Sequence, residues 1–201
     1  MKIGVLASGS GTNLQAIIDK LHKNEKVDVQ IAVVISDNEH AYALERARKA
    51  GIPAVFIDMS RYPTREEFDE AIDRVLRRYG VELVVLAGYM KILQPPFVRK
   101  WRNRIMNIHP ALLPSFPGTH AVRDALRYGV KITGVTIHFV DEGVDTGPII
   151  AQIPVPVYDD DTEETLHNRI HVEEHKLYPE VIRLYAEGRI SVRGRKVRVR
   201  R

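Results

Sequence analysis

The sequence predicts an α/β fold built on a mostly parallel sheet with helices on both faces. Short apolar runs rich in β-branched residues alternate with helical patterns through the first half of the chain. Strands that alternate with helices form βαβ units, and such units place their strands in parallel. The nearly unbroken apolar run "VELVVLAG" suits a strand buried on both faces. These observations indicate a Rossmann-like, doubly wound sheet.

Five strands and three helices are expected before residue 110. The apolar runs place strands at 2–7, 29–36, 54–58, 81–88 and 104–109. The helical patterns lie at 13–23, 41–51 and 64–80, and the last two end at a glycine, as helices often do.

The second half departs from this alternation. Apolar runs at 131–140 and 147–157 flank the segment "DEGVDT", which predicts two antiparallel strands joined by an acidic loop. Pro154 and Pro156 place the second of these strands at an edge of the sheet, because proline cannot donate to a neighbouring strand. A long helix is expected to run to about residue 185, with Asp161 as its N-cap.

Length and composition restrict the class of protein. A chain of 201 residues can build one large domain around a single core. It has no cysteine, which excludes disulfides and thiolate chemistry, and no apolar run approaches the roughly 20 residues of a membrane span. The opening "MKIGVLASG" is too short for a signal-peptide core. We therefore expect a cytoplasmic protein without a membrane partner.

The net charge of +4 is concentrated at the end of the chain. Seven basic residues and no acidic one lie between Gly188 and Arg201, so the rest has 23 basic against 26 acidic residues. The tail "RISVRGRKVRVR" alternates Val or Ile with Arg around a glycine, which predicts a hairpin with a charged face. It lacks the interleaved aromatics that stack on bases. A hairpin is favoured over an RNA-binding tail, and no nucleic-acid partner is expected.

The loop "ASGSGTN" follows the first predicted strand and leads into the first helix. Gly9 and Gly11 permit a tight turn, and amides at a helix N-terminus can bind an anion. Leucine stands at the third glycine position of a dinucleotide fingerprint, and no Walker-type Gly-Lys-Ser/Thr follows. The loop fits either a packing turn or a cradle in which the amides of Gly11, Thr12 and Asn13 hold a small phosphate.

The segment "NIHPALLPSFPG" ends the strand predicted at 104–109. Asn107 and His109 would lie on one face of that strand, about 6 to 7 Å apart. A lone histidine is more often packed or solvated than catalytic. A carboxamide on the same face changes this balance, because it can stabilise an oxyanion while an imidazole moves protons.

The loop "DEGVDTG" places Asp141 and Asp145 after a strand. Asp and Gly favour turns in any case, so a plain hairpin turn is one interpretation. The other is that one carboxylate pairs with His109 and fixes its tautomer. Asn, His and Asp without a Ser or Cys nucleophile indicate direct group transfer with no covalent enzyme intermediate.

The segment "HVEEH" matches a zinc-peptidase pattern. His167, His171 and His175 also share a helical face at a spacing of four, which could bind a metal. A zinc site needs a further ligand from a separate element. The acidic residues that follow His175, Glu180 and Glu187, lie on or near the same helix. A solvated helix face is favoured, and no metal is expected.

Several segments together strongly resemble the folate-dependent glycinamide ribonucleotide formyltransferases of purine synthesis, in order and in spacing. The resemblance covers essentially the whole chain. It rests on "SGSGTNLQAI", "LERARKAGI", "VVLAGYMKIL", "NIHPALLPSFPG", "HFVDEGVDTGPII" and "EEHKLYP".

The resemblance implies a role for each matching residue. Asn107, His109 and Asp145 match the catalytic trio of the family. The matches to the ribonucleotide site are Gly11, Thr12, Asn13 and Glu174. The matches to the folate site are Arg65, Met90, Lys91, Ile92, Leu93, Asn107, Asp141, Glu142, Gly143, Val144 and Asp145.

The resemblance also implies the reaction and its participants. The amine of glycinamide ribonucleotide would attack the formyl carbon of 10-formyltetrahydrofolate, the co-substrate, and no metal is implied. Residues 1–201 would form a single formyltransferase domain, with a phosphate-binding half at 1–100 and a catalytic and folate-binding half at 101–201. The partners would be these small molecules, and the protein would be a monomer or homodimer.

Three alternatives to this hypothesis are disfavoured. Methionyl-tRNA formyltransferases carry an added C-terminal domain, which the basic tail cannot replace. Formyltetrahydrofolate deformylases usually carry an N-terminal regulatory domain, whereas the first strand here is expected at residue 2, and a phosphate loop serves no purpose when water is the acceptor. A nucleotide- or folate-binding module with an RNA-contacting tail is disfavoured by the complete set of catalytic residues.

Overall fold

The computed structural model describes all of residues 1–201. The chain forms two compact units, Met1–Met106 and Asn107–Arg201. The strand β5 (Ile105–His109) begins in the first unit and ends in the second. None of the helices combines the length and apolar character that a membrane span requires.

The first unit alternates strands and helices, as the sequence predicts. Its strands are β1 (Lys2–Leu6), β2 (Gln30–Ser36), β3 (Ala54–Phe56) and β4 (Leu83–Leu86), followed by the start of β5. Its helices are α1 (Thr12–Ile17), the π-helical turn η1 (Ile18–His22), α2 (Tyr42–Lys49), the 3-10 turn η2 (Met59–Arg61), α3 (Arg65–Arg78) and α4 (Pro95–Lys100). Neighbouring strands are parallel, and every residue of β4 is buried.

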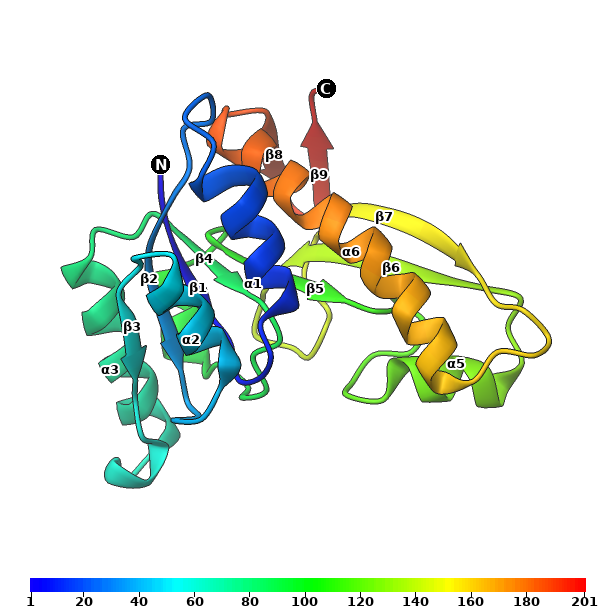
Figure 1. The fold of residues 1–201 in the computed structure, drawn as a ribbon, viewed down its shortest axis with the longest axis horizontal. Helices are drawn as coiled ribbons and strands as arrows, with labels where there is room; N and C mark the ends of the chain where they lie inside the picture. The colour runs from blue at the N-terminus through cyan, green and yellow to red at the C-terminus, as the bar shows by residue number, and fades with distance from the viewer. The chain divides into compact units, whose positions relative to one another are not determined.

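The second unit contains the antiparallel part of the fold. It consists of α5 (Ala121–Tyr128), β6 (Ile132–Phe139), β7 (Ile149–Pro156), α6 (Glu163–Ala186), β8 (Ile190–Arg193) and β9 (Lys196–Val199). The strands β6 and β7 pair antiparallel, and β8 and β9 form a separate hairpin. Figure 1 shows α6 as a long helix that runs alongside β6 and β7, which it contacts.

The strand order is β3-β2-β1-β4-β5-β6-β7, with β7 at an edge. The predicted mostly parallel sheet, the edge position of β7, the long helix and the terminal hairpin are therefore confirmed. The short helices α4 and α5 were not predicted from the sequence.

The prediction that Asp161 caps α6 is wrong. The N-cap is Thr162, whose hydroxyl accepts a hydrogen bond from the amide of Thr165 while the Thr165 hydroxyl accepts one from the amide of Thr162. The Asp161 carboxylate instead receives two 2.8 Å hydrogen bonds from the guanidinium of Arg169. This pairing lowers the pKa of Asp161. Both oxygens of the Asp161 carboxylate bind Arg169 in this bidentate ion pair, so Asp161 does not cap the helix.

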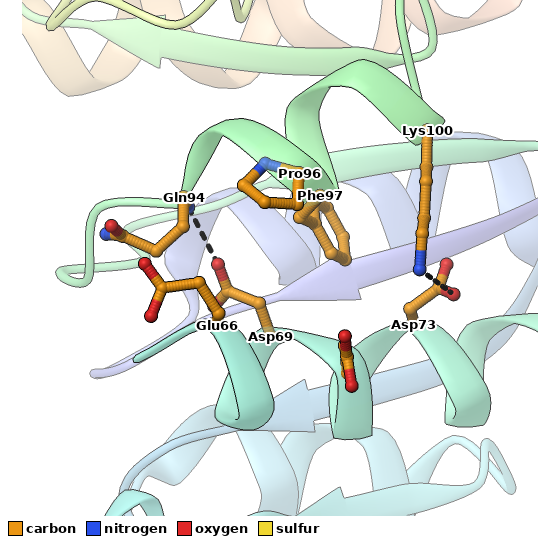
Figure 2. A pocket seen from close by; sticks show the side chains of 8 residues that line it. Glu66, Asp69, Asp73, Gln94, Pro96, Phe97 and Lys100 are labelled. Carbon is orange, nitrogen blue, oxygen red and sulfur yellow. Dashed lines mark hydrogen bonds and ion pairs between the residues drawn. The ribbon is translucent and has the colours of Figure 1, made fainter. Parts of the chain in front are cut away.

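A small acidic pocket lies between α3 and α4 in the first unit (Figure 2). The Asp69 carboxylate accepts a 2.7 Å hydrogen bond from the amide of Gln94, the N-cap of α4. Asp73 accepts one from the indole of Trp101 and pairs with Lys100. Burial raises the pKa of the Asp69 carboxyl to about 6, against the opposing effect of the Gln94 amide. Folding therefore disfavours the charged form of the Asp69 carboxyl.

The raised pKa of Asp69 predicts a specific dependence of stability on pH. Because the folded pKa of about 6 exceeds the ordinary 3.8, this group contributes most to stability below pH 4 and loses that contribution as pH rises towards 6. Asp69→Asn keeps an oxygen for the Gln94 amide and removes the charge. We expect this variant to exceed the wild type in free energy of unfolding at pH 7 by up to about 3 kcal/mol.

Urea unfolding at several pH values tests this expectation. The difference between Asp69→Asn and the wild type should shrink as pH falls from 7 to 4. Glu70→Gln, at an exposed position on the same pocket, is the matched control and should change stability little. A difference that stays constant across this pH range would contradict the assignment.

Candidate active site

The strand β5 delivers two of the predicted catalytic side chains. Asn107 and His109 are separated by one residue on this strand, so their side chains lie on the same face. Asn107 is half-buried and His109 is only 4% exposed. The sequence prediction that the strand ends at an imidazole and a carboxamide is therefore confirmed.

The loop between β6 and β7 brings Asp145 to His109. One Asp145 oxygen, Oδ2, lies 3.6 Å from His109 Nδ1 and accepts a 2.8 Å hydrogen bond from the amide of Gly118. The backbone of Asp145 has φ 54°, in the left-handed region that non-glycine residues rarely adopt. Strain of this kind persists where the surroundings hold it, and it is common in active sites. The structure thus brings Asn107, His109 and Asp145 together within the second unit.

Both ring nitrogens of His109 face acceptors. Nδ1 faces the Asp145 carboxylate, and Nε2 donates a 2.7 Å hydrogen bond to the carbonyl oxygen of Phe116. A neutral imidazole carries a single N–H and can serve only one of these acceptors, whereas an imidazolium donates to both. The Phe116 carbonyl and the Asp145 carboxylate therefore fix the orientation of the ring.

His138 is a member of this cluster that sequence reasoning missed. It is 2% exposed on β6, with Nε2 3.5 Å from Asn107 Nδ2 and 3.8 Å from Asp145 Oδ1. Its Nδ1 donates to the carbonyl of Phe139 at 2.9 Å, which leaves Nε2 as the acceptor in the neutral ring. Burial lowers the pKa of His138 and favours that neutral form. The available signal was a histidine within the apolar run that leads into the acidic loop.

Hydrogen bonds hold the two loops that surround the cluster. The Thr136 hydroxyl accepts from the amide of Leu113 and donates to the carbonyl of Ala111, so the loop after β5 is fixed to β6. In the acidic loop, the Asp141 carboxylate accepts a 2.6 Å hydrogen bond from the Thr146 hydroxyl. Arg195 of the terminal hairpin donates to the carbonyl of Thr146 at 2.8 Å. One basic residue of the tail thus supports the segment that follows Asp145.

The predicted phosphate loop lies in the first unit, between β1 and α1. Gly11 has φ 76°, and a Cβ there would lie 2.9 Å from Ala43 on α2, so only glycine fits without strain. The first amides of α1 have no acceptor within their own helix. The side-chain oxygen of Asn13 is buried without a hydrogen-bond partner, which is uncommon for a native polar group. The loop can offer donors and one acceptor to a ligand.

Glu174 is buried on α6, where its carboxylate accepts a 2.6 Å hydrogen bond from Nδ1 of His171. This hydrogen bond raises the pKa of His171. The rings of His167 and His171 stack at 4.1 Å, and those of His171 and His175 at 5.8 Å. The structure contains no group of three or more His, Asp or Glu side chains that could hold a metal ion.

The residues predicted to bind folate are divided between the two units, and most of them lie on loops. In the first unit, Met90 is 63% exposed and Ile92 is 60% exposed, which is unusual for large apolar side chains next to a buried strand. The amide of Met90 donates to the Ser8 hydroxyl at 2.9 Å, so this loop is anchored. The other members of the set in this unit are Arg65, Lys91 and Leu93, and those in the second unit are Asn107 and the loop 141–145.

Comparison with known protein families identifies the chain as a formyl transferase. A family profile described as formyl transferase matches residues 1–182, and the chain belongs to this family. The phosphoribosylglycinamide formyltransferase of Bacillus subtilis (strain 168) is 45% identical over 182 residues, which cover 90% of this chain and 93% of that protein.

A solved structure and a longer protein show further similarity. Glycinamide ribonucleotide transformylase 1 from Symbiobacterium toebii is 55% identical, with a TM-score of 0.96 over 99% of this chain and 93% of that chain. The trifunctional purine biosynthetic protein adenosine-3 of Drosophila pseudoobscura pseudoobscura is 48% identical over 188 residues. The chain spans only 14% of the length of that trifunctional protein, although 93% of the chain is matched.

Proposed function

We propose that this protein transfers the formyl group of 10-formyltetrahydrofolate to the amine of glycinamide ribonucleotide, a step of de novo purine biosynthesis. The observation that carries the proposal is the cluster of Asn107, His109 and Asp145, in which a buried imidazole faces a carboxylate at 3.6 Å. Membership of the formyl transferase family and the names of the similar proteins support the same activity.

The cluster suits direct transfer through a tetrahedral intermediate. When the amine attacks the formyl carbon, the carbonyl oxygen gains negative charge and needs hydrogen-bond donors. Asn107 Nδ2 would supply one donor. A protonated His109 would supply the other when its Nε2–H leaves the Phe116 carbonyl for the oxyanion. The Asp145 carboxylate would keep the ring oriented and compensate its charge, as a carboxylate does for a catalytic histidine elsewhere.

Proton transfer completes the reaction. The attacking nitrogen must lose a proton, and the departing folate nitrogen must gain one. Asp145 and His109 form a connected pair of proton-exchanging groups, and a water molecule could relay the proton between the two nitrogens. No side chain needs to form a covalent bond to the formyl group.

The substrate contacts are part of the proposal. The phosphate would be bound by the amides of Gly11, Thr12 and Asn13, and the buried Glu174 carboxylate would contact the ribonucleotide. The exposed Met90 and Ile92 side chains would contact the apolar rings of the folate. The remaining proposed folate contacts are Arg65, Lys91, Leu93, Asn107, Asp141, Glu142, Gly143, Val144 and Asp145.

The proposal extends to organisation and setting. Residues 1–201 would act as one formyltransferase domain, with phosphate binding in 1–100 and catalysis in 101–201. The protein would act in the cytoplasm on small molecules, without a nucleic-acid partner or a metal, as a monomer or homodimer.

The release of tetrahydrofolate tests the proposed acceptor. Purified protein is mixed with 10-formyltetrahydrofolate, and the folate product is followed by absorbance with and without glycinamide ribonucleotide. Release that requires the ribonucleotide is the expected result. Equal release without it would indicate a hydrolase, and the proposed acceptor would then be wrong.

A further inference from the structure

Arg46 on α2 is held against the loop that precedes α1. Its Nε donates a 2.7 Å hydrogen bond to the carbonyl oxygen of Ser10, and its Nη1 donates to the side chain of Gln15 at 3.3 Å. The guanidinium also lies over the ring of Tyr42, with Cζ 4.7 Å from the ring centroid. Three partners therefore fix one planar group in one orientation.

The bond to Ser10 determines where the next amide points. In a trans peptide the carbonyl and the following N–H point in opposite directions. Because the Ser10 carbonyl is directed at Arg46, the Gly11 N–H is directed away from α2. The preceding peptide is fixed in the same way, since the Gly9 carbonyl accepts a 3.1 Å hydrogen bond from the amide of Ala43 on α2.

The carbonyls of Gly9 and Ser10 thus point towards α2, and the amides that follow them, those of Ser10 and Gly11, point away from it. Gly11 continues this arrangement with φ 76°, and its own carbonyl accepts from the amide of Gln15 in the first turn of α1. A series of amides that point to the same side forms a concave anion site. Arg46 is the only charged side chain that donates a hydrogen bond to one of these loop carbonyls, that of Ser10.

We infer that Arg46 is a positioning residue for the phosphate loop. It fixes the Ser10–Gly11 peptide so that the Gly11 N–H is aimed at the phosphate of the substrate before that substrate binds. The charge of Arg46 is already engaged by a carbonyl, an amide oxygen and an aromatic face, so its role is orientation of the backbone. This inference rests on the proposed function and adds a residue to the ribonucleotide site.

The test compares two acceptors in the Arg46→Met variant. With glycinamide ribonucleotide, KM should rise about tenfold while kcat stays close to the wild-type value, because about one charge-assisted hydrogen bond loses its preset geometry. With the corresponding ribonucleoside, which lacks the phosphate, wild type and variant should have the same kcat/KM. A general loss of structure would lower kcat/KM for both acceptors.

Two further variants sharpen the comparison. Arg48→Met, on the same helix, removes an exposed guanidinium that lies 3.5 Å from Glu45, and it should leave both acceptors unaffected. Arg46→Lys keeps the charge without the planar fork, so it should recover little of the lost affinity. Full recovery by lysine would overturn the inference, because charge alone would then suffice.

The outcomes separate this inference from the proposed function. If the wild type turns over glycinamide ribonucleotide and Arg46→Met has an unchanged KM, the positioning role is wrong and the activity stands. If the wild type shows no turnover with glycinamide ribonucleotide, the proposed function itself fails. An increase in KM for the ribonucleotide together with an equal loss with the ribonucleoside would contradict a phosphate-specific role.

Discussion

His109→Ala and Asp145→Asn are expected to lower kcat for formyl transfer by about 10² to 10⁴, the range typical of general acid–base groups. In the first variant the oxyanion loses a charged donor. In the second, the neutral amide can still accept from the Gly118 amide, but it no longer compensates the charge on His109. Steady-state kinetics with both substrates at saturation measures the effect.

The double variant, which combines His109→Ala with Asp145→Asn, tests whether the two residues act together. Because His109 and Asp145 act as a unit, the combined loss should be much smaller than the product of the two single losses. His40→Ala, which alters an exposed histidine of the first unit, is the control and should retain wild-type kcat. Wild-type turnover in His109→Ala, or fully multiplicative losses, would refute the assigned pairing.

Gly11→Ala is expected to raise KM for glycinamide ribonucleotide by about 10- to 100-fold, because one hydrogen bond to the charged phosphate is lost. The added Cβ would lie 2.9 Å from Ala43, and a φ of 76° is unfavourable for alanine. The loop must shift, and its amides then no longer converge on the phosphate.

Gly9→Ala is the matched control for this substitution. Gly9 lies in the same loop, but a Cβ there meets no atom within 4 Å and its φ is not in the left-handed region. Its KM should stay near the wild-type value. An unchanged KM in Gly11→Ala would show that the phosphate binds elsewhere.

The predictable parts of the fold are those in which burial imposes a pattern. A strand such as β4 must be apolar throughout because every one of its residues is buried, and this pattern is visible in the sequence. The helix α4 has only six residues, too few to establish a clear period. The helix α5 has eight residues, as many as the predicted α2, and ends at Gly129, so it was overlooked although its pattern was readable. The cap of α6 was misassigned because Asp161 and Thr162 are both good capping residues, and the distant Arg169 decides between them.

The candidate site was predictable where side-chain chemistry is distinctive. Asn107 and His109 lie at the end of β5, and Asp145 lies in the loop after β6, where polar side chains interrupt an apolar pattern. His138 was missed because a single histidine inside an apolar strand resembles a packed residue, and only the tertiary structure places it beside Asn107. The Phe116 carbonyl that accepts the hydrogen bond from His109 Nε2 could not be predicted at all, because every residue has a carbonyl and the loop conformation selects one.

We propose that Asn107, His109 and Asp145 catalyse direct transfer of the formyl group from folate to the ribonucleotide amine. Isotope-labelled 10-formyltetrahydrofolate, incubated with enzyme and glycinamide ribonucleotide and analysed by mass spectrometry, tests it most directly. The account predicts that the label appears in formylglycinamide ribonucleotide in an amount equal to the tetrahydrofolate released. Label recovered as free formate, with the ribonucleotide unmodified, would contradict it.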